Sequence, residues 1–116
     1  MNYLSFHRTF RISCLVVLLS QLPLAAADPV PLSGTWYGEL NLVVQKLRIG
    51  FKIEDTPDGS LKGVMDSLDQ SAFGIPLSLV QRDKAQVQIE VESLGVVFKA
   101  TLSEDGQQLG GTFNQN

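Results

Sequence analysis

Few side chains in this sequence could carry out chemistry, and the most reactive ones stand near the N-terminus. The chain has one histidine, His7, and one cysteine, Cys14. These residue types often serve as general base, nucleophile or metal ligand. No Gly-x-Ser-x-Gly and no Ser-x-x-Lys pattern occurs, so two common motifs of serine nucleophiles are missing.

Asp66 and Asp69 are the carboxylates whose spacing could place two acids in one site. Paired carboxylates can perform general acid–base catalysis. Acids and amides in loops more often accept hydrogen bonds from backbone groups, and we favour that structural interpretation. The alternative is a binding or docking loop over residues 66–76, whose candidate contact residues are Asp66, Ser67, Asp69, Gln70, Gly74, Ile75 and Pro76.

Two other acidic segments have simpler explanations. Asp55-Thr56-Pro57 is similar to the Asp-Thr-Gly of aspartic proteases, but proline replaces the glycine and the following Asp58-Gly59 predicts a turn. Residues 66–74 lack the alternating oxygen ligands of a calcium loop. We therefore expect no catalytic residue, no metal site and no cofactor.

Residues 1–27 have the organisation of a secretory signal peptide. Arg8 and Arg11 lie in an N-terminal part without acids, residues 12–24 are apolar, and Ala25-Ala26-Ala27 supplies the small residues of a cleavage site. The apolar run is too short to span a bilayer, so a membrane anchor or a buried helix is the weaker alternative. We predict a helical leader cut after Ala27 and a periplasmic or secreted protein without a stable membrane anchor.

Removal of this leader would leave residues 28–116, with seven bases and twelve acids and hence a net charge of −5. That part has no histidine and no cysteine, which excludes disulfides, Ser-His-Asp triads and the usual zinc ligands. An acidic domain also lacks the basic surface that nucleic acids require. These residues predict a domain that binds but does not catalyse.

Apolar and polar residues alternate along most of residues 28–116, which predicts an all-β fold. Residues 47–53 and 86–92 carry the clearest stripes, and residues 56–59 and 104–106 predict turns. About seven strands favour an antiparallel meander that closes into a small lipocalin-like barrel. The predicted core residues are Trp36, Leu47, Ile49, Phe51, Ile53, Val87, Ile89, Val91, Phe98, Leu102 and Phe113.

Residues 65–76 read Met-Asp-Ser-Leu-Asp-Gln-Ser-Ala-Phe-Gly-Ile-Pro, and Gly34-x-Trp36-x-Gly38 lies upstream of them. This order resembles the β-rich N-terminal domain of secreted bacterial α/β-hydrolases of the serine esterase and peptidase type. The family pattern is close to LDSPDQGAxGIP, from which Leu68 and Ser71 depart. The resemblance covers essentially all of residues 28–116. It implies an accessory barrel-like domain without catalytic residues, which packs against a hydrolase domain.

The same family implies one further strand after residues 112–115, and we expect that strand to be missing from a truncated or stand-alone chain. Two open sheet edges, near Trp36 and Phe113, would then recruit a hydrolase domain or a second copy of the chain. The alternative function is a carrier of a small apolar ligand, because Gly34-x-Trp36-x-Gly38 is also similar to the lipocalin opening motif. In that motif the tryptophan plugs the base of the barrel.

Overall fold

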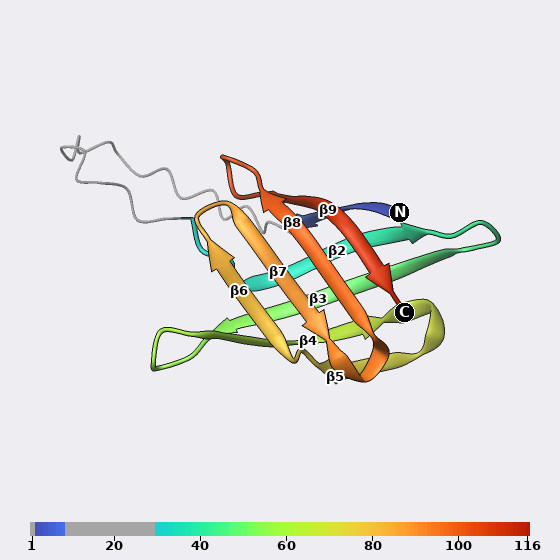
Figure 1. The fold of residues 1–116 in the computed structure, drawn as a ribbon, viewed down its shortest axis with the longest axis horizontal. Helices are drawn as coiled ribbons and strands as arrows, with labels where there is room; N and C mark the ends of the chain where they lie inside the picture. Colours follow the sequence, from blue (N-terminus) through green and yellow to red (C-terminus); the bar gives the residue numbers. More distant parts are fainter. Residues whose placement is uncertain (1, 9–29) are drawn as a thin grey trace, which may run out of the picture.

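A computed structural model describes residues 2–8 and 30–116 of the chain (Figure 1). These residues form one antiparallel sheet with the strand order β5-β4-β3-β2-β1-β9-β8-β7-β6, which curls into a half-barrel. The predicted all-β antiparallel meander is therefore confirmed. Its strands are β1 (Asn2–Arg8), β2 (Gly34–Asn41), β3 (Lys46–Asp55), β4 (Leu61–Ser67), β5 (Ala72–Pro76), β6 (Leu79–Asp83), β7 (Gln86–Val91), β8 (Val96–Leu102) and β9 (Gln108–Gln115), with short 3₁₀ helices η1 (Leu68–Gln70) and η2 (Glu92–Leu94).

The described residues hold nine strands, where the sequence pattern predicted about seven. β5 lies inside the segment 66–76 that was expected to be a loop, and β1 lies inside the predicted leader. Residues 2–8 of the leader thus form a strand and not a helix, while residues 9–27, with the predicted cleavage site, lie outside the described part. Across that part, no helix has the length and apolar character needed to cross a membrane.

β1 lies between the first and the last strand of the predicted domain. Phe6 pairs with Gly38 of β2 on one side and with Leu109 of β9 on the other. The expected open edges near Trp36 and Phe113 are therefore closed in the described chain, and the sheet ends instead at β5 and β6. This placement is possible because residues 3–7 alternate between polar or exposed and apolar side chains, as a half-buried strand does.

The two edge strands meet at one corner of the half-barrel. The Leu77 N–H donates to the Gly63 carbonyl at 3.0 Å, and the Ser78 N–H donates to the Glu90 carbonyl at 2.8 Å. The short connection between β5 and β6 is thus bonded to β4 on one side and to β7 on the other. This corner draws the two ends of the sheet towards each other.

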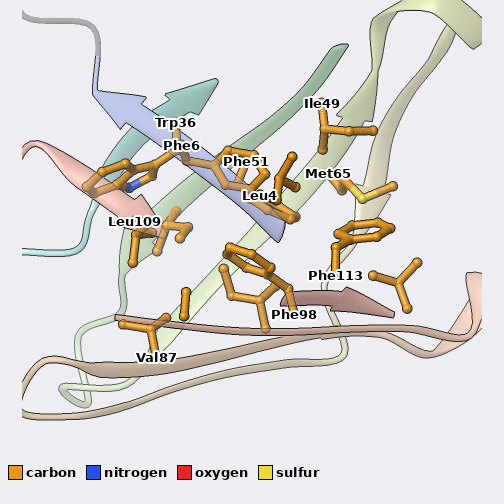
Figure 2. Packing of buried hydrophobic residues seen from close by; sticks show 14 of the residues in the cluster. Leu4, Phe6, Trp36, Ile49, Phe51, Met65, Val87, Phe98, Leu109 and Phe113 are labelled. Carbon is orange, nitrogen blue, oxygen red and sulfur yellow. The ribbon is translucent and has the colours of Figure 1, made fainter. Parts of the chain in front are cut away.

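The core lies between the two halves of the curled sheet, which cross in Figure 1 with β6–β9 in front of β2–β4. Figure 2 shows the side chains from both halves pointing toward one another. All eleven predicted core residues are buried. β1 adds Leu4 and Phe6, and the Phe6 ring centroid lies 4.9 Å from that of Phe51 and 5.0 Å from that of Phe98.

Trp36 closes one end of this core. Its side chain is fully buried, and its indole N–H donates to the Leu32 carbonyl at 2.9 Å. The guanidinium carbon of Arg8 lies 4.6 Å from the centroid of the indole ring, which is cation–π geometry. A buried tryptophan needs a hydrogen-bond acceptor for its indole N–H, and here the acceptor is the Leu32 carbonyl in the backbone before β2.

The predicted turns over residues 56–59 and 104–106 are confirmed, and each is held by an aspartate. Asp58 accepts hydrogen bonds from the Ser60 backbone N–H and hydroxyl, at 3.1 and 2.6 Å. Together with the Thr56 hydroxyl, these donors lower the pKa of Asp58 to about 2. Gly59, with φ +85°, takes the left-handed position that completes the turn.

Candidate functional site

Residues 66–76 form a structured hairpin between β4 and β5. The pairing register shifts between Met65 and Ser67, and η1 follows directly. Ser71 and Gly74 have φ angles of 51° and 68°, which turn the chain out of extended conformation. The shift and these two residues disturb the alternation of side chains, so the pattern predicted a loop where a bulged hairpin occurs.

Asp66 holds the two strands of this hairpin together. Its side chain is buried, and its Oδ1 accepts a hydrogen bond from the Gly74 N–H at 2.7 Å. Its Oδ2 lies 3.2 Å from the Lys52 ammonium on β3. Burying a carboxylate is unfavourable unless it is hydrogen-bonded or paired, and here each oxygen has a partner.

Asp69 connects the same hairpin to β3. It forms a two-pronged ion pair with Arg48, with Nη2 to Oδ1 at 2.8 Å, and also accepts the Arg48 backbone N–H at 2.7 Å. These hydrogen bonds lower the pKa of Asp69 and raise the pKa of Arg48. The structural interpretation of the two acids is thereby confirmed, because both accept backbone N–H groups and neither is free of a basic partner.

The other candidate contact residues divide between the interior and the surface. Ser67 is buried, and its hydroxyl donates to the Gln70 side-chain oxygen at 2.8 Å. Ile75 is half-buried and packs against the core, whereas Gly74 and Pro76 are exposed. Phe73 is the large apolar side chain of the hairpin that is exposed, at 64%, and it was not among the predicted contact residues.

A second hairpin brings more apolar surface to the same end of the molecule. Val43 and Val44, in the turn between β2 and β3, are fully or almost fully exposed. This turn and the β4–β5 hairpin lie at the same end in Figure 1, and the Arg48–Asp69 ion pair joins β3 to η1 of that hairpin. We call Val43, Val44 and Phe73 the apolar tip. Sequence reasoning missed the two valines, although three consecutive apolar residues in a turn are a recognisable signal.

The centre of the half-barrel is occupied by phenyl rings. The Phe51 and Phe98 centroids are 5.9 Å apart, and those of Phe98 and Phe113 are 6.4 Å apart, with Phe6 between Phe51 and Phe98. A small apolar ligand would have to displace one of these rings. Among residues 2–8 and 30–116, no three His, Cys, Asp or Glu side chains are grouped as a metal site would require.

Comparison with protein families, with curated proteins and with solved structures gives no match for this chain. The fold and the site therefore have to be interpreted from the residues themselves. The site consists of a hydrogen-bonded hairpin, two carboxylates that are paired with basic side chains, and the apolar tip.

Proposed function

We propose that the domain is a non-catalytic docking module, which binds a secreted serine hydrolase through the apolar tip. The carboxylates near this surface do not offer a free general acid or base, because Asp66 faces Lys52 and Asp69 is paired with Arg48. The surface instead offers exposed apolar side chains on a hairpin whose backbone is hydrogen-bonded.

The observation that carries the proposal is the way in which Phe73 is presented. Asp66 accepts the N–H of the neighbouring Gly74, so the backbone beside Phe73 is held while the ring stays exposed. Full burial of a side chain of this size contributes about 1.5–3 kcal/mol. Because the hairpin is already ordered, less of this free energy is lost to entropy on binding.

The sequence resemblance supports a secreted serine hydrolase as the partner. Residues 65–76 carry the most specific part of the resemblance to accessory domains of secreted α/β-hydrolases, and the same residues build the hairpin that presents Phe73. The leader-like residues 1–27 support export, which would place module and enzyme in the same compartment.

An active-site probe tests this function directly. The tagged full chain is incubated with the exported proteins of the source organism, which have been labelled with a fluorophosphonate that reacts with serine nucleophiles. We expect the chain to retain a labelled hydrolase and the Phe73→Asp variant to retain at least tenfold less. Thr101→Asp is the matched control, because it places the same charge on an exposed position of β8 away from the tip.

Two results would overturn the proposal. One is equal retention by the wild-type and Phe73→Asp chains, or no retained labelled protein. The other is covalent labelling of this chain itself, together with turnover of a chromogenic ester, which would make the chain an enzyme.

A further inference from the structure

β1 completes the sheet although it belongs to a segment whose sequence predicts removal. Leu4 and Phe6 are 1% and 0% exposed, and β1 is paired along both of its sides. Cleavage after Ala27 would remove both side chains from the core and leave β2 and β9 without a neighbour between them. We call the space that β1 fills between these strands the β1 slot.

The walls of the β1 slot contain glycines that leave room for the occupant. A Cβ at Gly38 of β2 would lie 2.9 Å from the Ser5 carbonyl oxygen and 3.0 Å from the Phe6 ring. A Cβ at Gly110 of β9 would lie 2.5 Å from the Tyr3 hydroxyl oxygen. Glycine weakens a strand and often marks the close approach of another chain segment. Both walls are thus shaped for a strand with bulky side chains.

The far end of the slot accepts a cation. The Arg8 N–H donates to the Gln107 carbonyl at 2.9 Å, and the guanidinium covers Trp36 and bonds to the Pro31 carbonyl. Partial burial and the nearby Arg82 lower the pKa of Arg8 and so oppose the positive charge, which is held by the contact with Trp36 and by the Pro31 carbonyl. Alternate positions of the occupant are therefore apolar at 4, aromatic at 6 and cationic at 8.

We propose that the β1 slot is a strand-acceptor site, which β1 fills before the leader is removed. Afterwards the partner donates an extended segment with the pattern apolar–x–aromatic–x–cation, antiparallel to both β2 and β9. The identity of the donor as the hydrolase rests on the proposed function, whereas the slot and its pattern do not. Backbone pairing on both sides provides affinity, and the two pockets for Leu4 and Phe6 provide selectivity.

The test uses the full chain with β1 driven out of the slot. In the variant Leu4→Asp/Phe6→Asp, two charges replace the buried side chains of β1. A fluorescent peptide with the sequence of residues 2–8 is then added, and binding is followed by anisotropy. We expect it to bind at least about 100-fold more tightly than a control peptide with aspartate at the two apolar positions, given the free energy of burying leucine and phenylalanine.

A matched variant shows whether binding requires an empty slot. Ser5→Asp/His7→Asp places the same charges on β1, at a half-buried and an exposed position facing away from the core, so β1 stays in place and the peptide should not bind. Equal binding of both peptides to the Leu4→Asp/Phe6→Asp chain, or binding of neither, would overturn the proposal. If that chain is unfolded, excess peptide must restore the near-ultraviolet circular dichroism of Trp36. If the peptide does not restore this signal, the proposal is also overturned.

Other occupants are separated by two further measurements. Sedimentation of the wild-type chain measures whether it forms dimers. Dimers that form by exchange of β1 would assign the slot to a second copy and overturn the partner proposal. Phe73→Asp should leave peptide binding unchanged, because Phe73 lies on β5 and outside the slot. A failure of the slot is therefore distinguishable from a failure of the apolar tip.

Discussion

At the scale of single residues, four aspartates of this domain bind backbone groups. Asp58, Asp66, Asp69 and Asp105 each accept a hydrogen bond from a main-chain N–H. Hydrogen bonds to the ionised form of a carboxylate favour that form. The pKa values of Asp58, Asp69 and Asp105 are accordingly lowered. These side chains stabilise turns and the candidate hairpin.

The first prediction concerns Asp69 and pH. Its pKa is lowered in the folded chain, so its contribution to stability is fully present above the unfolded value of about 3.9 and is lost as the pH falls through the folded pKa. We expect Asp69→Asn to lower the urea midpoint at pH 7 and to have a smaller effect at pH 2, because part of the stabilisation has by then been lost. Urea titrations at both pH values measure this difference.

The control for this prediction is a weaker ion pair. Glu54→Gln removes the partner of Lys62, which lies 4.0 Å away and on the surface, and this change should leave the midpoint nearly unchanged. An Asp69→Asn chain as stable as wild type at pH 7 would show that the Arg48 contacts do not hold the hairpin.

At the scale of elements, β1 and β2 approach each other closely where Phe6 pairs with Gly38. A methyl group at position 38 would press on the backbone of β1 as well as on the Phe6 ring. The ring end could shift, but the Ser5 carbonyl is part of the strand pairing and has less freedom. The glycine is thus a condition for β1 to lie in the sheet.

The second prediction follows from this contact. Gly38→Ala should destabilise the chain by about 1–3 kcal/mol, the usual cost of overpacking. Hydrogen exchange should show faster exchange for the β1 amides than for those of β7 and β8. Glu39→Ala, at the next and exposed position of β2, is the control and should change neither quantity. Unchanged protection of β1 in Gly38→Ala would contradict the close packing.

At the scale of the whole molecule, one core joins strands from both ends of the described chain. Phe6 from β1 contacts Phe51 from β3 and Phe98 from β8. A single ring therefore links the two halves of the curled sheet. Its loss would weaken the half-barrel as a whole and not one hairpin.

The third prediction compares two aromatic residues of β1. Phe6→Ala should destabilise the chain by about 3–5 kcal/mol, because it leaves a cavity in the centre of the core. Tyr3→Ala on the outer face, where the ring is 71% exposed, should cost less than about 1 kcal/mol. Denaturant unfolding followed by Trp36 fluorescence measures both. Equal effects would mean that β1 is not held in the core.

Much of the candidate site lay beyond sequence reasoning, for identifiable reasons. The turns at Asp58 and Asp105 were predictable because the aspartates and glycines of a turn act on their immediate neighbours. The hairpin of residues 66–76 was predicted as a loop, since a register shift destroys the alternation. Val43 and Val44 are far from Phe73 in the sequence, and only the pairing of β3 with β4 brings their two hairpins to the same end of the molecule.

The amino-acid sequence by itself determined an antiparallel all-β chain, its tight turns and the side of each main strand that is buried. These properties follow from alternation and turn chemistry, which operate over a few neighbouring residues. Only the tertiary structure decided that residues 2–8 join β2 to β9. That choice pairs Phe6 with Leu109 across nearly the whole chain, and such pairing depends on which strands have a free edge and a cavity to fill.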